Sequence, residues 1–138
     1  MNILFVCRYN RFRSRTAEAY FKKINKNKKI KVKSAGIFKG NYPLSPIQVK
    51  TGKKLGIDIN GRPQAISSKL LAWQDLIIVI TDDYPKGLFN YGSYKNKVII
   101  WKIKDVLTRK NERANINIMK EIIKKVDKLN KELNKKSK

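Results

Sequence analysis

Two short apolar runs constrain the fold of this 138-residue chain more than any other feature. Residues 3–7 and 76–80 each hold five apolar residues in succession, without the polar alternation of a strand that has one face in water. Uninterrupted runs of this length are typical of parallel strands that are covered on both faces. We expect both runs to be strands of one sheet, with residues 76–80 in a central position.

Two more segments extend the predicted sheet. Residues 30–34 alternate apolar and charged side chains and end at Ala35-Gly36, a pattern that suits an edge strand followed by a turn. Residues 98–101 form a further apolar run, which leads into a polar loop at residues 102–110. Because helical patterns separate the strands, the sequence predicts a parallel α/β sandwich, a fold that places ligands at the carboxyl ends of its strands.

Helices are predicted from apolar spacing and from capping signals. Apolar residues at helical spacing indicate a first helix that begins near Arg13 or Ser14. Capping signals then predict three shorter helices, which run from Ser45-Pro46 to about Leu55 with Gly56 as the stop, from Ser67 through Leu71, and from Asp82 or Asp83 through Phe89.

A long helix with one apolar stripe is predicted from residue 114 onward. The stripe consists of Ile118, Met119, Ile122, Ile123, Val126, Leu129 and Leu133. It lasts for only about two heptads, so docking on the chain's own sheet is favoured over a coiled-coil seam. We therefore expect one domain over residues 1–134, followed by a frayed basic tail at residues 135–138.

Cys7 is the only cysteine, and the chain has no histidine. An internal disulfide, a zinc cluster of Cys and His ligands and a histidine-based catalytic dyad are therefore excluded. Any nucleophile in this chain has to work without imidazole. We expect neither a metal nor another cofactor.

The chain is strongly basic, with 33 Lys and Arg against 10 Asp and Glu and a net charge of +23. This charge favours anionic partners such as nucleic acids, acidic membranes or phosphorylated proteins, although a compositional bias of the genome explains the frequent Lys, Asn and Ile equally well. Basic and aromatic residues do not alternate, so we expect only weak, sequence-indifferent nucleic-acid binding. The sequence shows neither a membrane-spanning run nor the features of a signal peptide, which predicts a cytoplasmic protein.

The segment from Cys7 to Ser14 carries the predicted chemistry. It places a thiol at a strand end, the guanidinium of Arg13 six positions later and a hydroxyl at a helix start. Backbone N–H groups in such a loop can bind a tetrahedral oxyanion together with the helix N-terminus, and Arg13 can add a bidentate contact. The same groups favour the thiolate, which is the reactive form of a cysteine. The alternative is a buried structural cysteine with Arg13 on the surface.

These residues resemble the active-site loop of low-molecular-weight protein tyrosine phosphatases. The match to that loop consists of Val6-Cys7, Asn10, Arg13-Ser14 and Ala17-Glu18-Ala19. The resemblance continues in chain order through Ser34-Ala35-Gly36, Pro43, Pro46, Gly56-Ile57-Asp58, Arg62, Leu70-Leu71, Asp75-Leu76-Ile77 and Trp101-Lys102-Ile103-Lys104-Asp105. It implies an α/β fold, a three-layer sandwich with a four-stranded parallel sheet and helices on both faces.

The resemblance also implies a role for each matched residue. Cys7 would attack the phosphorus, Arg13 would hold the equatorial phosphate oxygens, and Asp105 would be the general acid. Asn10 would brace the loop, and Ser14 would form a hydrogen bond to the sulfur. The implied phosphate-binding residues are Arg8, Tyr9, Asn10, Arg11, Phe12, Arg13 and Ser14. Asp82 and Asp83 are rival carboxylates for the acid role, although helix capping suits them better.

The chain departs from the family where substrate is selected. Tyr9 stands where the family usually has glycine, and the usual tyrosines after the general acid are missing. An aromatic wall for a phenyl ring must therefore come from Tyr9, Phe38 or Tyr42. Arg8 and Arg11 either attract acidic or multiply phosphorylated substrates or are solvated loop charges.

The resemblance predicts a metal-independent cysteine phosphatase that hydrolyses phosphotyrosine or other aryl phosphates through a phosphocysteine intermediate. One alternative is a non-catalytic protein that binds phosphate or nucleic acid on the same fold. Another is an arsenate reductase coupled to external glutathione, because the thioredoxin-coupled relay needs two further cysteines that this chain lacks.

Overall fold

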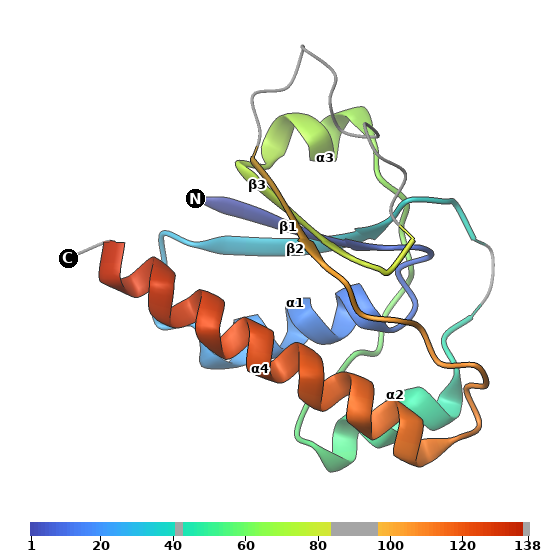
Figure 1. The fold of residues 1–138 in the computed structure, drawn as a ribbon. Helices are drawn as coiled ribbons and strands as arrows, with labels where there is room; N and C mark the ends of the chain where they lie inside the picture. The colour runs from blue at the N-terminus through green and yellow to red at the C-terminus, as the bar shows by residue number, and fades with distance from the viewer. Residues whose placement is uncertain (41–42, 84–96, 137–138) are drawn as a thin grey trace.

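The computed structural model describes residues 1–40, 43–83 and 97–136, and these contain four strands and four helices (Figure 1). In chain order the elements are β1 (Asn2–Cys7), α1 (Arg13–Ile24), β2 (Lys31–Gly36), α2 (Pro46–Lys54), α3 (Ser68–Trp73), β3 (Leu76–Ile80), β4 (Lys97–Trp101) and α4 (Glu112–Lys136). Each of the four predicted strands is confirmed. The helix expected from Asp82 or Asp83 through Phe89 lies almost entirely outside the described residues.

The four strands form one parallel sheet in the order β2-β1-β3-β4. In this register Phe5 of β1 lies between Ser34 of β2 and Ile78 of β3. β1 and β3 each have a strand on both sides, and residues 3–7 and 76–80 are all buried. The predicted interior position of β3 and the edge position of β2 are confirmed.

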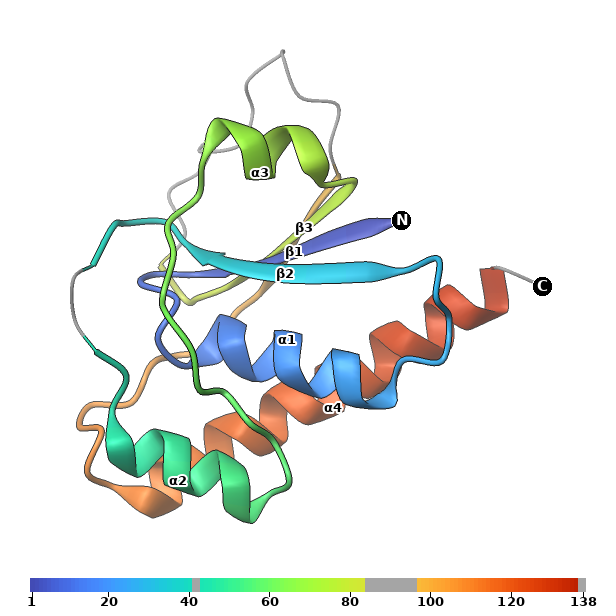
Figure 2. The ribbon, with the colours of Figure 1, turned by 180° about the vertical axis from the view of Figure 1, so that it is seen from behind.

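Helices cover both faces of the sheet, which gives the predicted three-layer sandwich. Seen from the front and from behind, α1 and α4 lie on one face with α2 beside them, and α3 lies on the other face (Figures 1 and 2). Alternate residues of β1 serve the two faces: Phe5 packs with Phe21 of α1, whereas Leu4 packs with Leu70 of α3. Burial of both faces is the reason that β1 and β3 appear in the sequence as uninterrupted apolar runs.

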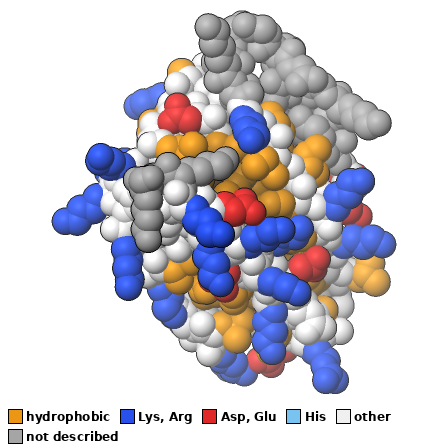
Figure 3. All heavy atoms as spheres, turned by 60° about the vertical axis from the view of Figure 1, so that its left-hand side comes forward, with side chains coloured by type: hydrophobic (Ala, Val, Ile, Leu, Met, Phe, Trp, Pro, Cys, Tyr) orange, Lys and Arg blue, Asp and Glu red, His pale blue; other side chains and the backbone are white. Residues whose placement is uncertain are grey.

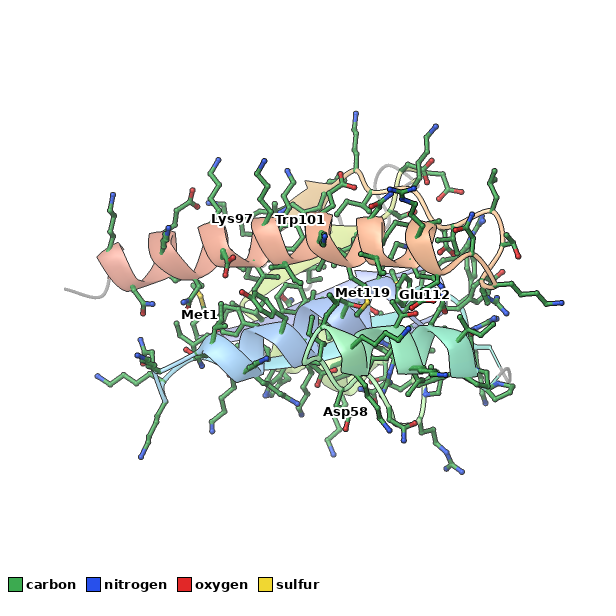
Figure 4. The ribbon with its side chains drawn as sticks, turned by 90° about the horizontal axis from the view of Figure 1, so that it is seen from below. Met1, Asp58, Lys97, Trp101, Glu112 and Met119 are labelled. Atoms are coloured by element: carbon green, nitrogen blue, oxygen red, sulfur yellow. The ribbon has the colours of Figure 1, made fainter. Side chains whose placement is uncertain are left out.

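The apolar stripe of α4 packs on the chain's own core. Ile122 and Val126 belong to the same buried cluster as Phe5 and Ile78 of the sheet. Met119 of α4 packs against residues of the neighbouring helices α1 and α2 (Figure 4). The prediction of intramolecular docking is therefore confirmed.

Polar side chains set the starts of three helices. Ser45 and Ser67 cap α2 and α3 as predicted, because each hydroxyl accepts a hydrogen bond from a backbone N–H in the first helical turn. Gly56 follows α2 with a φ of 75°, a left-handed conformation that glycine adopts readily. Asn111 is a cap that the sequence did not reveal: its Oδ1 accepts from a backbone N–H 3.1 Å away, and α4 begins at Glu112, before the predicted residue 114.

The C-terminal end of α4 corrects the expected frayed tail. The helix continues to Lys136 and so includes residues 135 and 136, whereas residues 137 and 138 lie outside the described chain. Leu133 still packs against the core, and Asn134 Nδ2 donates to Asn130 Oδ1 at 3.3 Å. The helix therefore continues two residues past the predicted domain end at residue 134.

Basic side chains are spread over the surface in view in Figure 3, with far fewer acidic side chains among them. The distribution matches the excess of 33 basic over 10 acidic residues, and on this face it does not gather into a single stripe. Of the helices that the structure describes, none is long and apolar enough to span a membrane.

Candidate active site

The predicted loop lies at the carboxyl end of the sheet. Cys7 ends β1, residues 8–12 form the loop, and α1 begins at Arg13. Phe12, at the N-cap position of α1, makes no side-chain capping hydrogen bond, and the first turn of the helix holds no acidic residue. The positive end of the helix dipole therefore faces the loop without a carboxylate from its own turn to neutralise it, which favours an anion there.

Gly36 allows β2 to approach this loop closely. A Cβ atom at residue 36 would lie 2.7 Å from the backbone carbonyl carbon of Tyr9 and 2.9 Å from the backbone nitrogen of Asn10, which is too close for any side chain. Two residues later, the N–H of Phe38 donates to the carbonyl of Arg8 at 2.9 Å. The first half of the loop is thus held against the end of β2.

A buried hydrogen-bond network lies behind the loop. Cys7 Sγ is 3.0 Å from Ser14 Oγ, and Asn10 Nδ2 donates to the same Ser14 oxygen at 2.8 Å. Asn10 Nδ2 also donates to Ser34 Oγ at 2.9 Å, and the Ser34 hydroxyl donates to a carboxylate oxygen of Glu18. We call these five residues, Cys7, Asn10, Ser14, Glu18 and Ser34, the inner network. Because Ser14 Oγ accepts from Asn10, its own proton is available to the sulfur.

Asn10 supports the loop with both its backbone and its side chain. Among the described residues it is the only one besides glycine with a positive φ, at 56°, a conformation that asparagine tolerates better than most residues. Its Oδ1 accepts from the N–H of Gln64 at 3.0 Å, and the residue is fully buried. The side chains of Asn10 and Ser14 therefore lie behind the loop and do not line the cavity in front of it.

Arg15 ties the inner network to the segment that follows α2, a role that nothing in the sequence indicated. Its guanidinium donates to four oxygens: Ile59 O at 2.7 Å, Asn60 O at 3.0 Å, Arg62 O at 3.2 Å and Asn10 Oδ1 at 3.4 Å. Burial lowers the pKa of Arg15, and the nearby negative charge of Glu18 opposes that shift. A half-buried arginine in this position fixes residues 59–62 against the loop.

Arg13 and Asp105 meet at the front of the loop. The Arg13 side chain is buried; its Nη1 donates to the carbonyl of Ile103 at 2.8 Å, and its Nη2 lies 3.7 Å from Asp105 Oδ2. Asp105 is 53% exposed in its side chain, and its Oδ1 accepts from the N–H of Val106 at 2.9 Å. The loop after β4 thus carries a carboxylate to the opening above a buried guanidinium.

One small cavity joins the three residues predicted to be catalytic. Its lining consists of Cys7, Arg8, Tyr9, Arg11, Phe12, Arg13, Gln48, Asp105 and Arg109. Gln48 and Arg109 had not been predicted. They are connected through Asn115 of α4, whose Oδ1 accepts from Gln48 Nε2 at 3.2 Å and whose Nδ2 donates to the carbonyl of Arg109 at 3.0 Å.

The mouth of the cavity is aromatic and partly exposed. The ring centroids of Tyr9 and Phe38 lie 6.0 Å apart, and the Arg8 guanidinium carbon lies 6.0 Å from the Phe38 ring centre. Arg8 also pairs with Asp83, with 3.1 Å between Nη2 and Oδ2. We call Arg8, Tyr9, Phe38, Asp83 and Asp105 the outer rim. Tyr42, the third aromatic residue predicted for this wall, lies outside the described residues.

The two arginines beside the loop differ in their surroundings. Arg8 has a half-exposed side chain, whereas Arg11 is only 7% exposed and lines the cavity. The reading of Arg11 as a solvated loop charge is therefore wrong. Its positive charge lies inside the site.

Asp83 is placed to hold Arg8 and is poorly suited to be the acid. Its Oδ1 accepts from the Thr81 hydroxyl at 2.8 Å, and its Oδ2 faces Arg8. The Thr81 hydrogen bond, aided by the charge of Arg8, lowers the pKa of Asp83 below its ordinary value. Both carboxylate oxygens of Asp83 are therefore engaged outside the cavity, whereas Asp105 lines the cavity and is the better placed of the two carboxylates.

Comparisons with known proteins agree with this geometry. A protein-arginine-phosphatase from Bacillus subtilis (strain 168) is 31% identical over 106 residues, which are 74% of this chain and 71% of the relative. A low molecular weight protein tyrosine phosphatase from T. tengcongensis has a structure with a TM-score of 0.82 at 27% identity, covering 96% of this chain and 99% of its own.

A third similar protein is an arginine phosphatase solved as a cysteine-to-serine mutant with a phosphorylated active-site serine. Its TM-score is 0.80 at 26% identity, and the match covers 98% of this chain and 97% of that one. The model of the low molecular weight phosphotyrosine protein phosphatases matches residues 2–138. With strand, loop, helix and cavity arranged as described and the match extending over the whole chain, this protein belongs to the low molecular weight phosphotyrosine protein phosphatase family.

Proposed function

We propose that this chain is a metal-independent cysteine phosphatase that hydrolyses phosphotyrosine or other aryl phosphates through a phosphocysteine intermediate. The observation that carries the proposal is the 3.0 Å contact between Cys7 Sγ and Ser14 Oγ at the wall of a cavity that Arg13 and Asp105 also line. These four residues supply a nucleophile, a donor to the sulfur, a cation for the phosphate and an acid. No imidazole is required.

Cys7 is the nucleophile of the proposed reaction. The sulfur lies at the start of α1, 3.0 Å from the Ser14 hydroxyl, and lines the same cavity as the buried guanidinium of Arg13. The thiolate is the reactive form of a cysteine. The thiolate attacks phosphorus as the bond from phosphorus to the leaving oxygen breaks. When water later breaks the P–S bond, the Ser14 proton stabilises the departing thiolate. Support for such an intermediate comes from the arginine phosphatase that carries a phosphoryl group on a serine in place of its cysteine.

Arg13 and Asp105 divide the remaining work. The planar guanidinium of Arg13 can hold two phosphate oxygens at once and offsets the charge of the transferring group, which is the part that a metal ion plays in other phosphatases. Asp105 protonates the leaving oxygen in the first step, because a phenol has a pKa of about 10 and leaves poorly as a free anion. In the second step the same carboxylate takes a proton from the attacking water. Phosphate and the Cys7 thiolate are the products.

Two features of the cavity favour an aryl phosphate. The rings of Tyr9 and Phe38 stand together at the mouth, where the phenyl group of a substrate would lie. Arg11 and Arg109 add positive charge to the cavity lining, which disfavours a cationic leaving group.

Phosphoarginine is the second candidate substrate. It is favoured by the 31% identity to a protein-arginine-phosphatase, and the same nucleophile and acid would serve a P–N bond. The guanidinium of that substrate would have to leave beside Arg11 and Arg109, so we rank it below phosphotyrosine. The sequence relationship and the charge of the cavity thus point to different substrates, and only a direct comparison separates them.

The test is steady-state hydrolysis of p-nitrophenyl phosphate in the presence of a chelator, followed by kcat/KM for matched peptides with phosphotyrosine or phosphoarginine. We expect turnover that the chelator does not change, and a higher kcat/KM for phosphotyrosine. A preference for phosphoarginine would reassign the substrate and leave the mechanism in place. Phosphate binding without turnover of any of these three substrates would favour the non-catalytic alternative. Glutathione-dependent reduction of arsenate would favour the arsenate reductase.

A further inference from the structure

A basic groove leads away from the mouth of the cavity. It has two connected hollows that share Pro43, Arg62 and Pro63; the first reaches Tyr9 of the outer rim, and the second runs along α2. Part of its lining comes from the segment after α2, which runs past the end of β2 in the view from behind (Figure 2). We call it the flank groove and define it by four cations and two prolines: Lys39, Lys50, Lys53, Arg62, Pro43 and Pro63.

All the charge in the described lining of the flank groove is positive. Its four cations are exposed, and none of them lies within 4.0 Å of a described carboxylate. Lys54, which follows Lys53 in α2, lies outside the groove and is paired with Glu112. The high net charge of the chain alone does not produce this pattern, because another hollow, beside α1, mixes Arg15 and Lys22 with Glu18 and Asp58.

The walls of the flank groove are held in place. The N–H of Gly36 donates to the carbonyl of Gln64 at 2.7 Å, and the N–H of Ile66 donates to the carbonyl of Gly36 at 2.9 Å, so the end of β2 fixes one wall. Arg15 binds the carbonyls of residues 59, 60 and 62 in the same wall. A preformed groove loses little freedom when a flexible ligand binds to it.

We propose that the flank groove binds an acidic peptide segment next to the phosphorylated residue of a protein substrate. This inference rests on the proposed function, because the groove begins at Tyr9 and its occupant would be continuous with the phosphoresidue in the cavity. The prolines offer an apolar surface to an extended backbone, while Lys39 and Arg62 face the nearer acidic residues and Lys50 and Lys53 the more distant ones. A single-stranded nucleic acid is disfavoured because, in the described lining, Tyr9 is the one aromatic side chain available for base stacking.

The experiment compares phosphotyrosine peptides of equal length whose flanking residues are either Glu and Asp or Gln and Asn. For the unmodified protein we expect kcat/KM to be about tenfold higher with the acidic flanks, and the advantage to shrink as salt is raised. Lys50→Glu and Arg62→Glu should each lower the acidic-to-neutral ratio by about two- to fivefold, the usual range for exposed ion pairs. For peptides with Lys flanks, kcat/KM should be higher with these two variants than with the unmodified protein.

Lys125→Glu is the matched control, because it makes the same charge change at an exposed position of α4. It should leave the acidic-to-neutral ratio as it is in the unmodified protein. An equal fall in Lys125→Glu and Lys50→Glu, or the lack of any preference for acidic flanks, would overturn the groove assignment. So would an oligodeoxythymidine that competes better than the acidic peptide and loses affinity in Lys50→Glu, since it would assign the groove to nucleic acid.

The two proposals fail in different ways. An unmodified protein that hydrolyses p-nitrophenyl phosphate but ignores the flanks contradicts only the flank groove. If the unmodified protein hydrolyses nothing, the proposed function fails, and fluorescence anisotropy with the same labelled peptides then decides about the groove. Tighter binding of the acidic peptide that is weakened by Lys50→Glu and not by Lys125→Glu would still support it, and equal binding of both peptides would overturn it.

Discussion

The inner network and the outer rim lie on opposite sides of one loop and differ in almost every physical respect. Residues of the inner network are largely buried, and Cys7, Asn10, Ser14 and Ser34 are joined by hydrogen bonds of 2.8–3.0 Å. In the outer rim the side chains are partly exposed, and the contacts include an ion pair at 3.7 Å and rings 6.0 Å apart. The buried side is thus held by a continuous set of short hydrogen bonds, whereas the side chains of the exposed side make fewer contacts of that kind.

We expect the inner network to govern the type of reaction and the outer rim to govern the choice of substrate. A buried polar group that loses its partner costs more free energy than the hydrogen bond contributes, so we expect a change in the inner network to disturb the position of Cys7, the proposed nucleophile. A change in the rim alters what approaches the cavity and leaves the sulfur in place. Asp105 is the exception, because it belongs to the rim by exposure and to the chemistry by its proposed role.

Cys7→Ser should have the largest effect of any substitution. A serine hydroxyl keeps the contact with Ser14 but is a far weaker nucleophile, so turnover of p-nitrophenyl phosphate should fall to background while inorganic phosphate still binds. Steady-state rates and calorimetric titration with phosphate measure the two quantities. Retention of even a tenth of the original rate would contradict the proposed mechanism and remove the basis for the inner network's chemical role.

Asp105→Asn should have the next largest effect. We expect kcat to fall by about 10²–10⁴ for a phenolic leaving group, the usual contribution of general acid catalysis, and by much less for a leaving group that needs no proton. A series of aryl phosphates of increasing leaving-group pKa measures this dependence. Asp83→Asn is the control, since it removes a charge from the same rim, and equal losses with every leaving group in Asp105→Asn would reassign the acid.

Asn10 offers a test of how the inner network holds the loop. Asn10→Ala removes buried hydrogen bonds to Ser14, Ser34 and Gln64 and places alanine at a φ of 56°, so unfolding in urea should show a loss of about 2–4 kcal/mol. Asn10→Gly removes the same bonds but accepts the backbone angle, and should recover about 1–2 kcal/mol of that loss. Equal stabilities of the two variants would show that the backbone angle stores no strain.

The loop was predictable because its matched residues occupy one short stretch of sequence. Cys7, Asn10, Arg13 and Ser14 fall within eight residues, and strand, loop and helix around them follow from apolar patterning alone. The links of the inner network to Glu18 and Ser34 emerged only from the fold. The strands were equally accessible, since burial on both faces leaves an uninterrupted apolar run. Local spacing therefore predicted both the sheet and the loop that begins at Cys7.

Residues brought in from distant parts of the chain could not be predicted in the same way. Gln48 and Arg109 reach the cavity from α2 and from the loop after β4, through a connection to Asn115 that depends on how α4 packs. In the sequence Arg15 is one of 33 basic residues, and only the fold brings its guanidinium to its four hydrogen-bond acceptors. The length of α4 was underestimated because its cap at Asn111 and its last residues, 135 and 136, carry no apolar signal.

Phe38→Ala should change substrate preference by a modest amount. Loss of one ring from the aromatic mouth should lower kcat/KM for aryl phosphates by about two- to tenfold, the range expected for a contact between two aromatic rings. An alkyl phosphate of similar size provides the comparison, because it gains little from a ring at the mouth. An equal loss of kcat/KM with the aryl and the alkyl phosphate would mean that the Phe38 side chain supports the loop and does not contact the phenyl ring of a substrate.

The smallest effect should come from the contact of Asp83 with Thr81 and Arg8. The Thr81 hydrogen bond, with help from Arg8, lowers the pKa of Asp83 below its ordinary value of 3.8, so the ionised carboxylate is more favourable in the folded chain than in the unfolded one. That contribution to stability is present above the ordinary pKa and is lost as the pH falls through the lowered value. The stability difference between the unmodified protein and Asp83→Asn should therefore be constant above about pH 5 and should shrink below about pH 4. Urea unfolding across this range measures it, and a difference that grows on acidification would contradict the direction of the shift.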